Sequence, residues 1–119
     1  MAMAPNWRIL SAGTLTGDTV VNAKGEDLGK IEEIMLDLDR GRIAYAVVSF
    51  GGFLGVGNKL FAVPWNVLDV NTVAENVVLN VPREKLEQAP GFDKDNWPDT
   101  ADVSFMGDIY SYYEAPTYW

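Results

Sequence analysis

Three short segments of this 119-residue chain carry residue types that could bind a ligand or do chemistry. The first, Gly52 to Lys59, nearly spells a phosphate-binding loop. Such a loop places Lys directly after its last glycine, then Ser or Thr, at the start of a helix. Here Asn58 intervenes, and a β-prone run follows from Leu60. We therefore interpret the segment as a hairpin loop whose apolar residues could contact a partner protein: Phe53, Leu54 and Val56.

The second segment, residues 93–99, has the spaced carboxylates of a calcium-binding loop. That loop requires an oxygen ligand at its fifth position and glycine at its sixth. The chain has Trp97 and Pro98 at these positions. We therefore expect Asp95 and Asn96 to form a turn and not a calcium site.

The third segment contains Asp37 and Asp39, a carboxylate pair of the kind used in acid–base catalysis. They lie beside Arg40 and Arg42, and the sequence favours a turn with surface ion pairs, which contribute about 0–1 kcal/mol. The chain has no His and no Cys, so the commonest general base, imidazole ligands and thiolate chemistry are absent. We predict no catalytic residue, no metal site and no organic cofactor.

The charge balance limits the classes of partner. Nine Lys and Arg face seventeen Asp and Glu, which gives a net charge of −8. This charge opposes direct nucleic-acid binding and docking on an anionic membrane, and it favours a neutral or basic protein partner. The first ten residues do not resemble a secretory signal, and no stretch approaches the roughly 20 apolar residues of a membrane span. We expect a cytoplasmic protein.

The chain length and its 48% hydrophobic content indicate one globular domain, and its elements are mostly short β-strands. A β-prone run at residues 19–21 is followed by the segment 28–38. In this segment Ile34, Leu36 and Leu38 alternate with Met35 and Asp37, which is the period of a β-strand. Ile31 is out of phase by one residue, and a bulge near Glu32 and Glu33 would restore it to the same face. A helix over residues 28–38 is the alternative. We favour a strand because a turn and another β-prone run follow directly.

Residues 43–50 are apolar at successive positions, so they predict a central strand that is covered on both faces. Further strands are expected at 59–64, 67–70 and 76–81, and one or two helical turns at 82–88. About six short strands with short connections predict an all-β fold, a small antiparallel barrel with a short helix. The predicted core residues are Ile34, Leu36, Leu38, Tyr45, Val47, Leu60, Val63, Leu79 and Val81.

Four motifs together resemble the PRC-barrel domain family, named for the cytoplasmic domain of the photosynthetic reaction-centre H subunit and also found at the C-terminus of RimM. The motifs are Gly17–Asn22, Gly25–Ile31, Asp37–Val48 and Phe61–Trp65, and the resemblance covers roughly residues 10–88. It implies a small antiparallel barrel-like fold, no shared catalytic residue, and a scaffold role in larger assemblies. We accordingly divide the chain into a PRC-barrel-like domain, residues 1–90, and a C-terminal extension, residues 91–119.

The C-terminal extension differs in composition from the rest of the chain. It lacks Lys and Arg from residue 95 onward and is rich in aromatic residues, which disordered tails usually lack. We expect it to be largely ordered and to bury aromatic side chains, either on its own barrel or on a partner. Its candidate partner-binding residues are Trp97, Tyr110, Tyr112 and Tyr113.

These observations together predict a non-catalytic scaffold or protein–protein interaction module that forms a homodimer. A basic or neutral protein is the expected partner, without direct nucleic-acid contact. The alternative is a ribosome- or RNA-processing-associated factor that acts through a protein partner, which the family resemblance suggests.

Overall fold

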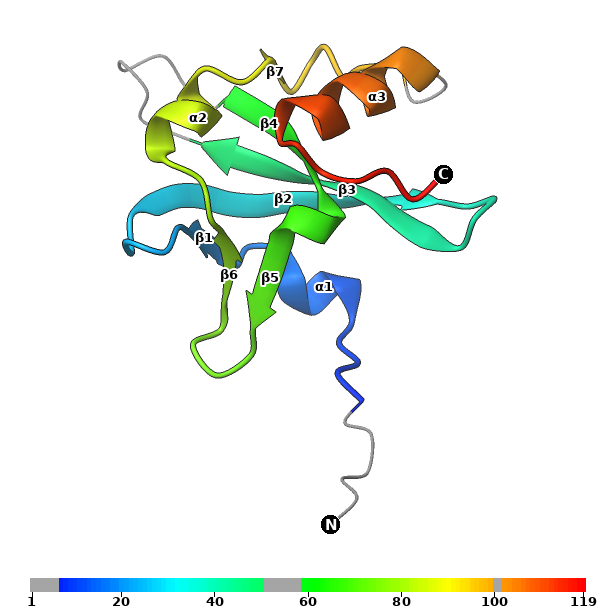
Figure 1. The fold of residues 1–119 in the computed structure, drawn as a ribbon. Helices are drawn as coiled ribbons and strands as arrows, with labels where there is room; N and C mark the ends of the chain where they lie inside the picture. Colours follow the sequence, from blue (N-terminus) through cyan, green and yellow to red (C-terminus); the bar gives the residue numbers. More distant parts are fainter. Residues whose placement is uncertain (1–6, 51–58, 100–101) are drawn as a thin grey trace.

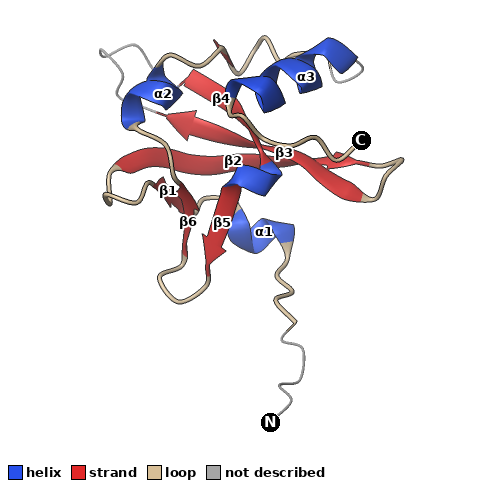
Figure 2. Ribbon diagram, viewed as in Figure 1, coloured by secondary structure: helices blue, strands red, loops and turns tan. Residues whose placement is uncertain are grey.

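The computed structural model describes residues 7–50, 59–99 and 102–119, so the predicted partner-binding residues Phe53, Leu54 and Val56 lie outside the described residues. A single sheet organises the fold (Figures 1 and 2). Its strands are β1 (Thr19–Val21), β2 (Asp27–Asp37), β3 (Arg42–Phe50), β4 (Lys59–Pro64), β5 (Leu68–Asn71), β6 (Asn76–Leu79) and β7 (Gly91–Phe92). The helices are α1 (Ala12–Leu15), the 3-10 turn η2 (Trp65–Val67), α2 (Arg83–Glu87) and α3 (Val103–Tyr112).

The prediction of a strand-dominated fold is confirmed, but the antiparallel barrel of six strands is wrong in three details. The described residues form seven strands in the order β5-β6-β1-β2-β3-β4-β7. The sheet is mixed, because β6 returns from the β5 hairpin and pairs with β1 in parallel. It is also not closed within the described part of the chain, since β5 and β7 are its two edges.

The strand predicted over residues 28–38 is confirmed as β2, and the alternative helix is wrong. The pairing with β3 shifts between Ile31 and Glu33, which leaves Glu32 as an extra residue at the predicted bulge. The bulge returns Ile34 to the face that buries Ile31. The alternation of apolar and polar residues along the sequence therefore predicted both the strand and the bulge within it.

The prediction that Leu36 and Leu38 belong to the core is wrong. A second register shift pairs Met35 with Tyr45 but Leu36 with Ile43, so Ala44 of β3 is the extra residue. Beyond this irregularity the hairpin extends past the residues of the core clusters. Leu36 is 61% exposed and Leu38 is 84% exposed.

The remaining predicted core residues are buried or half-buried, but they belong to two clusters and not to one core. The first cluster includes Ile34, Val63 and Leu79, with Val81 packed against it. The second includes Tyr45, Val47 and Leu60. Strand β3 supplies residues to both clusters, as expected for a strand that is apolar on both faces.

Helix α3 and the residues after it cover the second cluster. Figure 1 shows α3 lying across β4 and β3, with the C-terminal residues running back along β3. The side chain of Asp102 accepts a hydrogen bond from the Ser104 amide and so caps the helix. Ile109 and Tyr110 are buried in the same cluster as Tyr45 and Val47. The C-terminal extension is therefore ordered where described, and it packs on its own chain.

Glycine at position 29 is required by a close approach of two strands. Its φ is +114°, and a methyl group there would lie 2.2 Å from the carbonyl oxygen of Ser49. We predict that Gly29→Ala costs about 3 kcal/mol or more, because backbone would have to shift. Gly25→Ala is the matched control: φ is +80° but the space is open, so about 1 kcal/mol is expected. Urea unfolding of both variants measures the difference, and equal losses would contradict the close approach.

Candidate functional site

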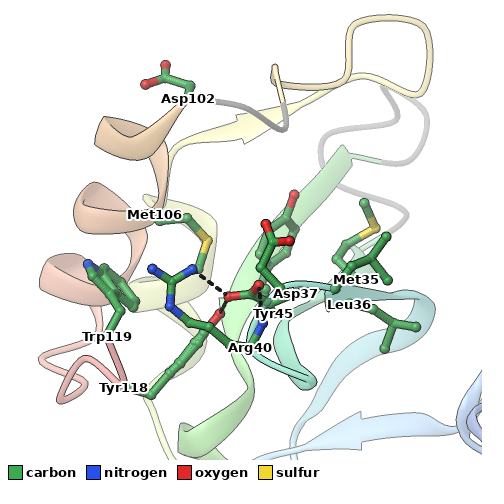
Figure 3. Close-up of a pocket in the computed structure, with 12 residues that line it drawn as sticks. Met35, Leu36, Asp37, Arg40, Tyr45, Asp102, Met106, Tyr118 and Trp119 are labelled. Carbon is green, nitrogen blue, oxygen red and sulfur yellow. Dashed lines mark hydrogen bonds and ion pairs between the residues drawn. The ribbon is translucent and has the colours of Figure 1, made fainter.

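A groove lies between the end of the β2–β3 hairpin and the C-terminal part of the chain (Figure 3). Its volume is about 550 Å³. One wall is formed by Met35, Leu36 and Leu38 of the hairpin, and the other by Met106 of α3 together with Trp119. We refer to this site as the hairpin–helix groove.

The hairpin wall is apolar and unusually exposed. Leu36 and Leu38 are exposed at the end of the hairpin, beyond the register shift at Ala44, and Met35 beside them is half-buried against the second cluster. Exposed aliphatic side chains that are adjacent to a hollow form a surface that a partner can cover with a gain in free energy.

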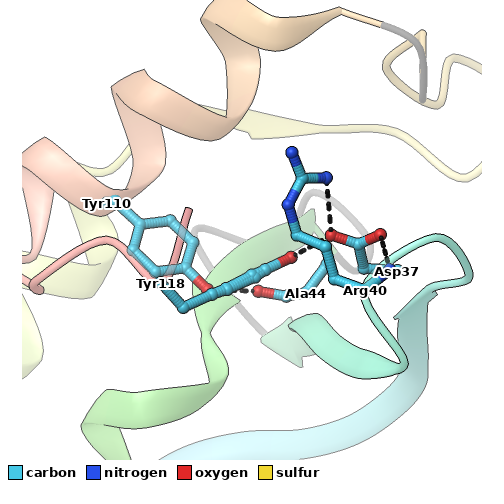
Figure 4. Close-up of polar contacts among 5 residues, drawn as sticks. All are labelled: Asp37, Arg40, Ala44, Tyr110 and Tyr118. Carbon is cyan, nitrogen blue, oxygen red and sulfur yellow. Dashed lines mark hydrogen bonds and ion pairs between the residues drawn. The ribbon is translucent and has the colours of Figure 1, made fainter.

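The opposite wall is held in place by Tyr110. Its ring is buried, and its hydroxyl donates a 2.6 Å hydrogen bond to the carbonyl oxygen of Ala44 (Figure 4). This acceptor belongs to the extra residue of the second bulge, which the β2 ladder leaves out. The Tyr110 ring also stacks with Tyr118 at 6.1 Å and meets Trp119 edge-on at 4.8 Å between centroids. Tyr110 therefore links α3, the C-terminus and the hairpin.

The floor of the groove is a polar cluster centred on Asp37 (Figure 4). The Tyr118 hydroxyl donates to Oδ2 of Asp37 at 2.7 Å, and Nη1 of Arg40 lies 3.3 Å from the same oxygen. The Arg40 amide donates to Oδ1 at 3.2 Å. The guanidinium of Arg42 lies 4.4 Å from the centre of the Tyr118 ring, a cation–π contact. These contacts bind the C-terminus to the hairpin turn.

The same contacts fix the protonation of the cluster. The hydrogen bond from Tyr118 is the main reason why the pKa of Asp37 is lowered, and Arg40 adds to it. Loss of solvation, followed by the bond to Asp37, raises the pKa of Tyr118 to about 12. Asp37 is thus held as an ionised acceptor, and a carboxylate with a lowered pKa is a weak base. The arrangement suits structure and binding better than proton transfer.

The structure separates the predicted partner-binding residues of the C-terminal extension. Tyr110 is buried beside the groove, whereas Trp97 is 39% exposed and packs on Phe92 at 5.1 Å. Tyr112 and Tyr113 contact each other at 5.0 Å. Tyr113 is buried, and the hydroxyl of Tyr112 donates to the Lys85 carbonyl at 2.6 Å. No finding tests their role in binding, which stays a prediction.

Sequence reasoning named several residues that line the groove, but as a turn or as core and not as a binding site. Asp37 and Arg40 were expected to form a turn with an ion pair, and their contacts fit that interpretation. Met35, Met106 and Trp119 carry no local motif. The one available signal was the gathering of aromatic residues near the C-terminus, which had to pack somewhere.

Two further properties of the described residues bear on ligands and membranes. Within residues 7–50, 59–99 and 102–119, no group of three or more acidic side chains is arranged to hold a metal ion. No helix in these ranges has both the length and the apolar character needed to cross a bilayer.

Comparison with known proteins gives one family match. The sequence model described as the PRC-barrel domain matches residues 9–86, more than half of the chain. A crystal structure of a candidate 16S ribosomal RNA processing protein, RimM, from Pseudomonas aeruginosa is similar at 14% identity with a TM-score of 0.43. That similarity covers 63% of this chain and 45% of the other, so this chain spans less than half of that protein's length. No curated protein matches the sequence.

Two buried tyrosine hydroxyls allow a matched test of the packing beneath the groove. We predict that Tyr110→Phe destabilises the fold by about 1–3 kcal/mol, because the Ala44 carbonyl loses its donor. The Tyr113 hydroxyl is buried with no hydrogen-bond partner among the described residues. Tyr113→Phe should therefore be neutral or slightly stabilising. Chemical unfolding checks both, and a larger loss for Tyr113→Phe than for Tyr110→Phe would contradict this assignment.

Proposed function

We propose a function from one premise: this chain belongs to the PRC-barrel domain family, whose sequence model matches residues 9–86. That match also confirms the resemblance predicted from the sequence motifs. On this scaffold the chain acts as a non-catalytic interaction module that presents the hairpin–helix groove to another protein. The observation that carries the proposal is the exposure of Leu36 and Leu38 at the groove.

The chemistry of the groove supports binding over catalysis. Its most enclosed carboxylate, Asp37, is occupied by Tyr118 and Arg40, and its lowered pKa makes it a poor proton acceptor. The apolar wall offers surface whose burial is worth roughly 25 cal/mol per Å². A partner that covers Leu36 and Leu38 gains this free energy without disturbing the polar cluster.

Self-association is the second part of the proposal, and a different surface carries it. Trp7 is 81% exposed and Ile9 is 79% exposed, in the segment that precedes α1. The Arg8 guanidinium bonds to the Val70 carbonyl and holds this segment against edge strand β5. A neighbouring hollow of about 410 Å³ includes Leu10, Trp65 and Leu68. A twofold mate would cover both features, which gives a homodimer.

Photocrosslinking in the native cell tests the interaction module. We predict that benzoylphenylalanine at position 38 gives a discrete crosslinked product, because the partner covers this residue. The matched control is position 73, since Val73 is 94% exposed at the β5–β6 turn, outside the groove. Identical products at both positions, or none at position 38, would contradict the proposal. A ribosomal protein in the product would support the ribosome-associated alternative.

Light scattering tests the homodimer. We predict that the full chain has twice its monomer mass at about 100 μM, and that Trp7→Ser combined with Ile9→Ser shifts it to monomer, since these side chains form the apolar contact. Leu38→Ser removes a similarly exposed apolar side chain outside this surface and should leave the mass unchanged. A monomeric wild-type chain would remove this part of the proposal and leave the groove proposal intact.

A further inference from the structure

We propose that the occupant of the hairpin–helix groove is a basic amphipathic segment of a partner protein, with apolar anchors along one face and Lys or Arg beside them. This inference rests on the proposed function and adds the chemistry of the partner. It follows from the apolar wall, from the position of the unpaired carboxylates, and from the charge of the whole chain.

The apolar wall suits side chains of varied shape. Met35 and Met106 contribute from opposite sides of the groove, as Figure 3 shows, and methionine adapts to irregular apolar surfaces because it is unbranched and polarisable. Leu36, Leu38 and the 44% exposed Trp119 add aliphatic and aromatic surface. Such a groove accepts apolar anchors from a helix better than it accepts a flat surface.

The edge of the hairpin that faces β3 and α3 offers a partner no added-strand pairing. The hairpin residues that border it belong to β2 and are already paired with β3, for example Met35 with Tyr45. Where β3 extends beyond β4, the Ala44 carbonyl is taken by the Tyr110 hydroxyl. A partner that enters between the hairpin and α3 therefore meets side chains, which favours a helical segment with apolar anchors.

The residues that line the groove include more carboxylates than cations. Among the lining residues, Arg40 is the only cation, and it is paired with Asp37. Asp39 at the hairpin turn and Asp102 at the start of α3 remain, one on each wall, and both are exposed. Asp102 accepts its hydrogen bonds from Ser104 on Oδ1 and is not in an ion pair with any other residue that lines the groove. Two separated carboxylates thus flank the apolar wall.

The net charge of the whole chain also favours a cationic segment as the occupant of the groove. The net charge of −8 creates a field that draws a cationic segment toward the surface and speeds its association. The same charge disfavours a second copy as the occupant, because both chains would bring Asp39 and Asp102 to one interface. A cationic segment gains from the carboxylates and from the field together.

Two fluorescein-labelled peptides of equal length test this inference by fluorescence anisotropy. One is an amphipathic helix of Leu and Lys, and the other has Glu at every Lys position. We expect the Leu/Lys peptide to bind at least about 10-fold more tightly and to weaken as salt rises. Leu36→Ser combined with Leu38→Ser should abolish most of this binding, because the anchors lose their surface, whereas Val73→Ser should not change it.

A pair of charge-matched variants separates the groove from general attraction. Asp39→Asn with Asp102→Asn removes the flanking carboxylates, and Asn keeps the α3 cap. Asp69→Asn with Glu75→Gln removes the same charge from the β5–β6 hairpin. We expect the first pair to weaken Leu/Lys binding about 5-fold or more and the second less than about 2-fold.

Each outcome decides between the two proposals. Equal losses for the two charge variants mean that the attraction is general, and the inference about the carboxylates falls. Equal binding of both peptides, lost on the Leu-to-Ser substitutions, keeps the groove as a docking site but removes the preference for a basic partner. If neither peptide binds, the basic-segment inference falls, while crosslinking at position 38 still decides the proposed function.

Discussion

The constraint on which the rest of this structure depends is a central strand that is apolar on both faces. In β3, Ala46, Val48 and Phe50 belong to one cluster, and Ala44, Tyr45 and Val47 to the other. Burying such side chains stabilises by about 1.5–3 kcal/mol each only if both faces are covered. The rest of the sheet, with α2, encloses the first cluster. The second cluster needs a separate cover, and α3 supplies it.

This requirement makes the C-terminal residues part of the folding unit in physical terms, although the family match ends at residue 86. Ile109 and Tyr110 occupy the second cluster, and Phe105 meets Tyr45 edge-to-face at 5.7 Å. Tyr110 also satisfies the Ala44 carbonyl, which a bulge would otherwise leave without a partner. The helix that covers the second cluster thus also supplies a hydrogen-bond donor to the bulge in the hairpin. The boundary at residue 90 marks a change in the sequence pattern.

The groove is a by-product of the same geometry. Because Leu36 is exposed beyond the second bulge and Tyr110 fixes α3 beside the hairpin, two apolar walls face each other without filling the space between them. The contacts of Tyr118 with Asp37 and Arg42 then hold the last residues over one end. Stability and binding therefore use neighbouring side chains, with Tyr110 serving the core and Trp119 remaining available at the surface.

The sequence predicted a structural feature where the residues that determine it lie within one strand, and did not where they lie in different elements. The Glu32 bulge was predictable because Ile31 and Ile34 change phase within one strand. The Ala44 bulge was not, since it lies in the partner strand and leaves no mark on the alternation of Leu36 and Leu38. Helix α3 was missed because aromatic residues favour strands, and only the capping pair of Asp102 and Ser104 indicated a helix start.

The parallel pairing of β1 with β6 was equally hidden, because strands of three and four residues carry no preference for a partner or a direction. The groove combines these hidden features. It requires the exposed end of the hairpin for one wall and the helix for the other, and neither wall has the composition of a site when taken alone. A binding surface that depends on two long-range packing interactions cannot be predicted until both interactions are known. The local motifs therefore predicted only loops and turns.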